Sequence, residues 1–244
     1  MARLSKNGLI SGAVANLVFV NQGDRNIIRS KPDTIRQSDN TKKAAKAFGY
    51  ISRQDALYRR RLMHLCGLTS DDRYAYRHRA SMHKMAVRLY EGNESTVSLL
   101  EGNPKMLEGF VFNRHTEWQN VCRFFPDIHL DIEAGILTVR IPELVWKRDL
   151  KPPKKMIFAK LRFMCIAALP DEAMGKNVVL LSEFVIEASI GKHVPENIFS
   201  VEGIPEGHQL FVIGEVQFQQ AGIQVVSPHL RTAGTYLWGG KRVI

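Results

Sequence analysis

The feature that most limits the possible folds of this chain is a change of apolar pattern near residue 109. Beyond it, short apolar runs recur between turn residues, and apolar and polar residues roughly alternate in the segments 127–132 and 209–218. Such alternation is typical of half-buried strands. Seven or more short strands without intervening helices favour a sandwich or a barrel. The candidate strands are 109–113, 127–132, 136–141, 156–167, 178–188, 209–218, 223–226, 235–237 and 242–244.

A first helix is predicted from residue 39, where Asp39 or Thr41 can cap it, to Gly67, which ends it. Its apolar residues fall three, four or seven positions apart and therefore share one face. These residues are Ala44, Phe48, Ile51, Tyr58, Leu62 and Leu65. Asp55 interrupts that apolar face.

A second helix is expected after Thr69 or Ser70, either of which can cap it, and it should end at Gly92. Its apolar residues also share one face. They are Ala75, Met82, Ala86 and Leu89. The short link between the two helices predicts an antiparallel helix pair.

Residues 1–38 are expected to be extended, with a β-hairpin of strands 17–20 and 25–30 that ends at Pro32. A hairpin of two strands is only marginally stable in water. It must therefore lie against its own domain or against a neighbouring molecule, and both alternatives are open at this point.

The whole chain is thus predicted to have an α+β fold in four parts. Residues 1–38 form an extended arm with the hairpin, and residues 39–92 form the antiparallel helix pair. Residues 93–108 form a polar linker, because turn residues occur at 91–94 and at 101–104. A short helical turn is expected within it at 97–100. Residues 109–244 form an antiparallel β-sandwich.

The positive charge is concentrated at one end of the chain. Residues 1–90 hold 18 Lys and Arg against 6 Asp and Glu, a net charge of +12. Residues 91–244 hold 16 against 18, a net charge of −2. One end of the molecule should therefore attract anionic groups.

Basic residues on the predicted helices recur at spacings of four and seven, so each helix presents one basic face. Together with those of the arm, the candidate binding residues are Arg25, Arg29, Lys31, Arg36, Lys42, Lys46, Arg53, Arg60, Arg73, Arg77, Lys84 and Arg88. Three interpretations are open: binding of nucleic-acid phosphates, binding of an acidic protein surface or a neighbouring copy, and two solvated faces without a partner. The interleaved Tyr50, Tyr74 and Tyr76 can stack on bases or lie at the border of a core.

No catalytic signature occurs in the sequence. It contains no phosphate loop, no dinucleotide fingerprint, and no Gly-x-Ser-x-Gly, His-Glu-x-x-His or Cys-x-x-Cys pattern. One neighbouring set of soft metal ligands matches no closed zinc pattern, namely His64, Cys66, His78 and His83. One carboxylate cluster is better explained by solvent-facing turns than by acid–base catalysis, namely Asp127, Asp131, Glu133 and Glu143. We expect no catalytic residue, no bound metal and no cofactor.

The expected compartment is the cytoplasm. Three cysteines are too few and too scattered for a disulfide framework, and an odd count suits a reducing environment. The first residues lack the apolar run of a signal peptide, and no segment has the length of a membrane helix.

The segments 6–18, 27–32 and 40–48 resemble the start of a large uncharacterised family of bacterial proteins. They read Lys-Asn-Gly-Leu-Ile-Ser-Gly-Ala-Val-Ala-Asn-Leu-Val, Ile-Ile-Arg-Ser-Lys-Pro and Asn-Thr-Lys-Lys-Ala-Ala-Lys-Ala-Phe. Members of that family open with a glycine-containing segment, a short strand ending in Arg-Ser-x-Pro, and a basic, alanine-rich helix. The resemblance covers about residues 6–60. It implies a basic start and a β-rich end, and it implies no activity and no functional residue.

These observations together favour a non-catalytic structural or interaction protein. We expect it to assemble with copies of itself or with another protein through its basic N-terminal third, without a membrane partner. The alternative is sequence-independent binding of nucleic acid, and a more distant one is an enzyme without a familiar motif.

Overall fold

The computed structural model spans residues 1–244 and describes residues 2–5, 8–22, 25–31, 37–91, 94–171, 178–220 and 227–242. The chain forms two compact units, Met1–Ala45 and Lys46–Ile244, which are described one by one. Within the described ranges, no helix combines the length and the apolar character that crossing a membrane requires.

The first unit contains a small antiparallel sheet with the strand order β1-β2-β3-β4. Its strands are β1 (Arg3–Leu4), β2 (Ile10–Val14), β3 (Leu17–Gln22) and β4 (Arg25–Ser30). The predicted hairpin is confirmed by β3 and β4, which place Phe19 opposite Ile28. Strands β1 and β2 escaped prediction, because Gly12, which has a φ of 105°, interrupts the apolar pattern of β2.

Helix α1 (Asp39–Cys66) begins in the first unit and continues in the second. Its cap is Ser38, not Asp39 or Thr41 as predicted, because Ser38 Oγ accepts a hydrogen bond from the backbone N–H of Thr41 at 3.2 Å. Gly67 ends the helix as predicted. Its φ of 59° suits a residue without a side chain at the helix C-terminus.

Helix α2 (Tyr74–Met85) lies antiparallel to α1, as predicted. The second helix was expected to reach residue 92, but the backbone becomes extended at Ala86, with a ψ of 142°. The chain then enters strand β5 (Val87–Glu91), which pairs with β6 (Glu94–Ser98). Pairing between strands replaces the last turns of the predicted helix.

The segment 93–108 is more ordered than the predicted polar linker. Val97 and Ser98 belong to β6, so the predicted helical turn at 97–100 is wrong. The 3-10 helix η1 (Pro104–Leu107) follows, and Leu99 and Leu107 are fully buried. Tertiary packing of these two leucines decides the conformation of a segment whose composition is that of a loop.

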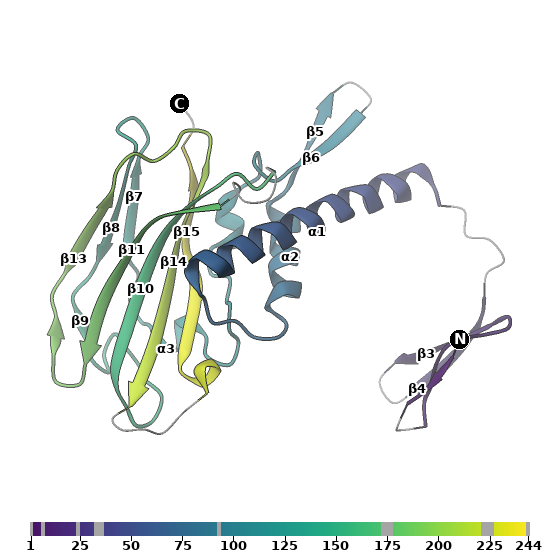
Figure 1. Ribbon diagram of the computed structural model, residues 1–244, viewed down its shortest axis with the longest axis horizontal. Coiled ribbons are helices and arrows are strands. Elements are labelled where there is room, and N and C mark those ends of the chain that lie inside the picture. Colours follow the sequence, from purple (N-terminus) through teal and green to yellow (C-terminus); the bar gives the residue numbers. More distant parts are fainter. Residues whose placement is uncertain are drawn as a thin grey trace. The chain divides into compact units, whose positions relative to one another are not determined.

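Two antiparallel sheets form most of the second unit (Figure 1). The four-stranded sheet has the order β11-β10-β14-β15 and consists of β10 (Met156–Ala168), β11 (Val178–Ser189), β14 (Gln209–Gln220) and β15 (Thr232–Lys241). The three-stranded sheet has the order β13-β8-β7 and consists of β7 (Asp127–Asp131), β8 (Ile136–Ile141) and β13 (Asn197–Val201). The remaining elements are α3 (Trp118–Val121), the paired β9 (Leu144–Val145) and β12 (His193–Val194), and the 3-10 helix η2 (Pro228–Leu230).

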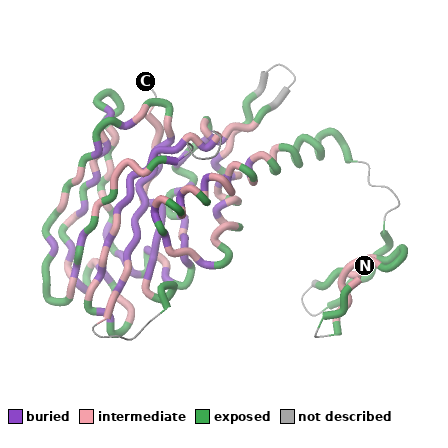
Figure 2. The backbone as a smooth tube through the Cα atoms, in the orientation of Figure 1, coloured by how far each residue is buried: buried purple, intermediate pink, exposed green. Residues whose placement is uncertain are grey.

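Strand β10 contributes side chains to both cores of the second unit. Leu161 and Phe163 belong to the core between the two sheets, whereas Met164 and Ile166 belong to the core that the four-stranded sheet shares with α1 and α2. Figure 2 shows the buried residues concentrated along the strands of the four-stranded sheet. The predicted α+β fold with an antiparallel β-sandwich is confirmed, and the helix pair packs on the outer face of one of its sheets.

Two of the strands predicted in the β-rich region differ in the structure, and two others, 223–226 and 242–244, lie wholly or mostly outside the described residues. The segment 109–113 forms only a single bridge, from Val111 to Thr235, because Gly109 is left-handed and Asn113 donates its side-chain N–H groups to the carbonyls of His229 and Thr232. The strand predicted at 235–237 is part of the longer β15.

Candidate interaction surfaces

The N-terminal sheet exposes charged and apolar side chains together. Arg25, Arg29 and Lys31 are exposed on or directly after β4, and Arg36 lies outside the described residues. None of the described residues between 2 and 45 is buried. The large apolar side chains that this sheet exposes are Leu4, Val14, Leu17, Val20, Ile27 and Ile28.

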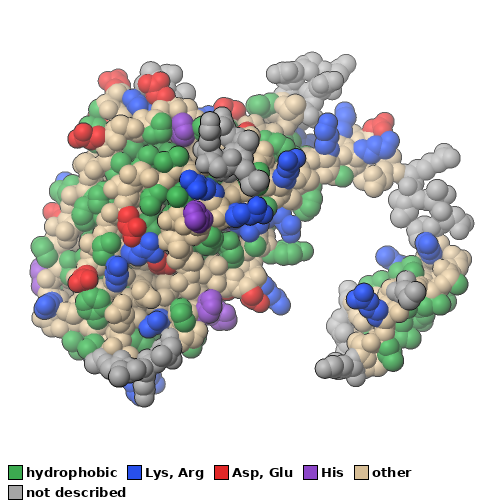
Figure 3. Space-filling view, in the orientation of Figure 1, with side chains coloured by type: hydrophobic (Ala, Val, Ile, Leu, Met, Phe, Trp, Pro, Cys, Tyr) green, Lys and Arg blue, Asp and Glu red, His purple; other side chains and the backbone are tan. Residues whose placement is uncertain are grey.

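The predicted basic residues of α1 are all exposed. They are Lys42, Lys46, Arg53 and Arg60. Figure 3 shows Lys and Arg side chains gathered along this helix. Lys42 Nζ lies 3.1 Å from Asp39 Oδ1, but both groups are exposed, so this ion pair stabilises the helix very little.

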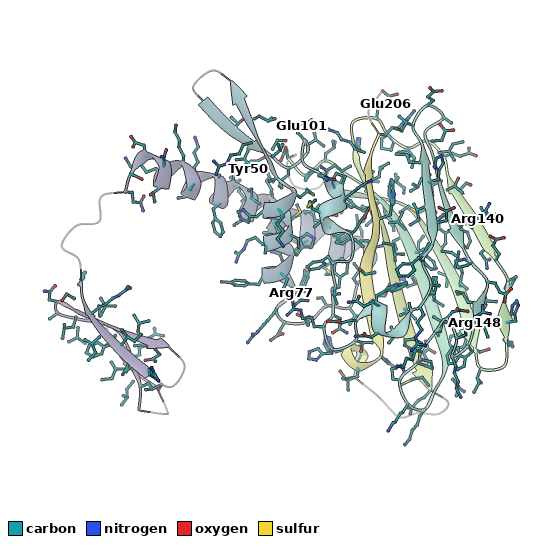
Figure 4. The ribbon with its side chains drawn as sticks, turned by 180° about the vertical axis from the view of Figure 1, so that it is seen from behind. Tyr50, Arg77, Glu101, Arg140, Arg148 and Glu206 are labelled. Carbon is teal, nitrogen blue, oxygen red and sulfur yellow. The ribbon has the colours of Figure 1, made fainter. Side chains whose placement is uncertain are left out.

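The predicted basic residues of the second helix separate in the structure. Arg73 precedes α2 and Lys84 lies in its last turn, and both are exposed. Arg88 belongs to β5, so it does not share a helix face with them as predicted. Arg77 does lie on α2, but its guanidinium group points toward the protein interior (Figure 4).

Arg77 forms a two-pronged ion pair with Asp71. Arg77 Nη1 and Nη2 donate to the two carboxylate oxygens of Asp71 at 2.9 and 2.7 Å, and Nη2 also donates to the carbonyl of Val111. Burial of Asp71 opposes its ionisation, but the hydrogen bonds from Arg77 and from the backbone N–H groups of Arg114 and Arg73 lower its pKa to about 2. Arg77 therefore joins α2 to a neighbouring loop and is committed to this structural contact.

A stack of aromatic and cationic side chains lies on the exposed side of the helix pair. The rings of Phe48 and His83 are stacked with centroids 4.8 Å apart. The Arg79 guanidinium carbon lies 5.6 Å from the Phe48 ring centroid and 4.6 Å from that of Tyr76. Phe48 is 52% exposed and Tyr76 74% exposed. Of the three tyrosines considered as stacking residues, only Tyr76 is exposed.

A polar network that the sequence did not reveal lies in the core between α1, α2 and β15. His78 Nδ1 lies 2.6 Å from Asp55 Oδ1, and His78 Nε2 lies 3.0 Å from the hydroxyl of Tyr236. Asp55 Oδ2 accepts a hydrogen bond from Arg59 Nε at 2.8 Å. Burial lowers the pKa of His78, and Asp55 opposes this effect. The interruption of the apolar face at Asp55 and the position of Arg59 four residues later were sequence signals of this network.

The Asp55–His78 pair resembles the acid–base half of a catalytic triad, but its surroundings differ. The side chains of Asp55 and His78 are fully buried, and the second imidazole nitrogen faces Tyr236. The Tyr236 and Tyr58 hydroxyls lie 3.2 Å apart, and both residues are buried. A substrate cannot reach the imidazole in this arrangement, so the network holds the helix pair to the sheet.

Asp171, which follows β10, joins α1 to the segment 98–100. Its carboxylate accepts hydrogen bonds from the Tyr50 hydroxyl at 2.7 Å, from Ser98 Oγ at 2.6 Å and from the backbone N–H groups of Leu99 and Leu100. Burial, together with Asp171, raises the pKa of Tyr50 to about 12. Tyr50 therefore has a structural role on the inner side of α1 (Figure 4).

Arg162 on β10 holds two carboxylates on the same face of the four-stranded sheet. Its Nε donates to Glu183 on β11 and its Nη1 to Glu215 on β14, each at 2.7 Å. Its Nη2 donates to the carbonyl of Cys66, and Glu215 accepts from the backbone N–H of Thr69. This cluster fastens the link between α1 and α2 to the sheet.

Several residues of the two other sets considered in the sequence make different contacts in the structure. Cys66 is buried and His83 stacks on Phe48, while His78 bonds to Asp55, and the described residues contain no group of three or more His, Cys, Asp or Glu arranged to hold a metal. In the carboxylate set, Glu143 pairs with His193 at 2.6 Å at an exposed position.

Comparisons with known proteins identify no relative. No family model, no curated protein and no solved structure matches the chain. The resemblance of residues 6–60 to an uncharacterised bacterial family stays a prediction.

Proposed function

We propose that this chain is a non-catalytic structural protein that assembles through its basic N-terminal part. One observation carries the proposal: the described residues of the N-terminal sheet bury no side chain, yet the sheet exposes six large apolar ones. A sheet gains independent stability when a second layer covers its apolar face. The exposed apolar residues lie on both faces of this sheet, since Ile27 and Ile28 are neighbours in β4. They therefore need a host, which we propose is another protein molecule.

Charge supports the same proposal. The first 90 residues carry a net charge of +12 and the remaining residues one of −2. Arg25, Arg29 and Lys31 lie beside the exposed apolar residues of β4, so a host with carboxylates next to an apolar strip matches this sheet best. The sandwich of a second copy is nearly neutral overall, with 15 Lys and Arg against 14 Asp and Glu in residues 109–244, but its edge strand β11 exposes Glu183 and Glu187 on either side of Val185, so it is one such host.

Deletion of residues 1–38 tests the proposal. We expect full-length protein to form an assembly in light scattering coupled to size exclusion, and the deletion variant to be a monomer. The far-ultraviolet circular dichroism of the sandwich should persist, because every buried residue in the described part of the chain lies from Ile51 onward. Full-length protein that is already monomeric at high concentration and low salt would refute the assembly function.

A second candidate function is binding of single-stranded nucleic acid without sequence preference. The stack of Phe48, His83, Arg79 and Tyr76 favours it, since exposed aromatic rings beside cations are typical of surfaces on which bases stack. In a filter-binding titration, replacement of both Tyr76 and Arg79 by Ala should weaken binding at least about fivefold. Arg140→Ala, which removes an exposed arginine of β8, is the matched control. No retention of single strands by the unaltered protein at low salt would eliminate this candidate.

A further inference from the structure

Two strands of the molecule each lie at the edge of a sheet. β4 is the last strand of the N-terminal sheet and β11 is the outermost strand of the four-stranded sheet. Neither pairs with a further strand on its outer side within the described residues. An edge strand presents unpaired N–H and C=O groups that another strand can pair with.

The exposed residues of these two edges are complementary in sequence. On β4, Arg25, Ile27 and Arg29 alternate along one face, and all three are exposed. On β11, the residues at the same spacing are Glu183, Val185 and Glu187, which are also exposed. Both strands thus carry an apolar residue between two like charges, and the sign of the charge is opposite on the two strands.

We infer that β4 of one copy adds to the β11 edge of a second copy as an antiparallel strand. This inference rests on the proposed assembly function. With Ile27 opposite Val185, the antiparallel register places Arg25 opposite Glu187 and Arg29 opposite Glu183. Opposite charges directly across a strand pair stabilise it.

The same register places an apolar pair on the other face of the two strands. Ile28, which is 57% exposed, comes to lie opposite Phe184. Phe184 is partly buried and stacks on Phe199 of β13, with ring centroids 4.4 Å apart. The added strand would therefore cover Ile28 against the rim of the sandwich core.

The charges also disfavour pairing of like edges. An antiparallel pair of two β4 strands centred on Ile27 places Arg25 opposite Arg29 of the other copy. A pair of two β11 strands centred on Val185 places Glu183 opposite Glu187. Like charges directly opposite one another destabilise a strand pair. The pairing of β4 with β11 avoids both repulsions.

The Arg25–Glu187 pair is the best one to alter. Glu183 already bonds to Arg162, so its replacement would also disturb the sheet. Arg25 and Glu187 make no ion pair with any described residue. Arg3→Glu, on the opposite edge of the N-terminal sheet, and Glu202→Arg, after β13, are matched controls at exposed positions.

Charge reversal in the full-length protein tests the contact. Arg25→Glu places a second carboxylate opposite Glu187, and Glu187→Arg places a second guanidinium group opposite Arg25. Each variant alone should therefore dissociate, with a dissociation constant raised at least about tenfold. An equimolar mixture of the two variants should assemble again. The unaltered β11 of Arg25→Glu can pair with the unaltered β4 of Glu187→Arg. The two altered strands also carry opposite charges and can pair with each other. Light scattering of each variant, of the mixture and of both controls at low salt gives the readout.

The outcomes separate this contact from the assembly function. Variants that assemble like the unaltered protein, while deletion of residues 1–38 still gives monomers, would overturn the β4–β11 contact and leave the proposed function standing. Failure of the mixture to assemble would overturn the contact as well. Assembly would be overturned if the unaltered protein is a monomer. Pairing of β4 with β11 within one molecule would then be indicated if each reversal lowers the melting temperature and the chain that carries both reversals regains it.

Discussion

Asp55 is the residue whose role differs most from its place in the apolar pattern. Its side chain has no exposed surface, and it lies among the apolar residues of α1. Burial of an unpaired carboxylate is very unfavourable. Asp55 is tolerated because one oxygen bonds to Arg59 and the other to His78. The network thereby selects one arrangement of α1 against α2, which packing of apolar side chains alone specifies less sharply.

Replacement of Asp55 should therefore destabilise the protein strongly. We expect Asp55→Leu to lower the free energy of unfolding by about 3–5 kcal/mol, because it leaves Arg59 and His78 without their buried partner. Asp55→Asn should cost less, since its amide oxygen still accepts one hydrogen bond. Urea denaturation followed by circular dichroism measures both. Asp72→Asn, at an exposed position before α2, should change the free energy by no more than about 0.5 kcal/mol. A loss equally small for Asp55→Leu would show that the network does not stabilise the fold.

At the scale of elements, two glycines distinguish packing from helix propensity. Gly49 lies at an exposed position in α1, and a side chain there would meet no atom within 4 Å. Gly102 lies in the tight connection between β6 and η1, where an added Cβ would collide with the backbone carbonyl of Met85. Glycine at position 49 therefore lowers the stability of the helix, whereas at position 102 only glycine fits without moving the backbone of Met85.

The same substitution should thus have opposite effects at these two positions. Gly49→Ala should stabilise the protein by up to about 1 kcal/mol, because alanine favours a helix more than glycine does. Gly102→Ala should destabilise it by about 1–3 kcal/mol, because backbone atoms must move. Thermal denaturation of the two variants side by side provides the comparison. Equal changes in melting temperature for both variants would show that residue 102 does not lie against the carbonyl of Met85.

At the scale of the whole molecule, the chain divides into a unit whose described residues include no buried one and a unit that contains both cores. Cooperative unfolding should therefore belong to residues 46–244. Deletion of residues 1–38 should leave the melting temperature of a dissociated sample unchanged. A lower melting temperature in the deletion variant would show that the N-terminal sheet is part of the same cooperative structure.

The sequence alone determined the elements that repeat with a short period. Alternation along 127–132 and 209–218 predicted strands that occur with nearly the same bounds, and Gly67 predicted the end of α1. The concentration of basic residues in the first third also follows from the sequence. These features are readable because the geometry of a helix or a strand sets the spacing of neighbouring side chains, whatever lies opposite them.

Only the tertiary structure decided what the polar residues contact. Arg77 has the spacing of a surface arginine but binds Asp71, and Arg88 continues a helical pattern but lies in a strand. Asp55 looked like a defect in an apolar face until His78 and Tyr236 completed its network. Tyr236 is 158 positions from His78, and no local spacing connects them. The partner of a buried polar group is chosen by how distant elements pack, which the sequence encodes only through the whole fold.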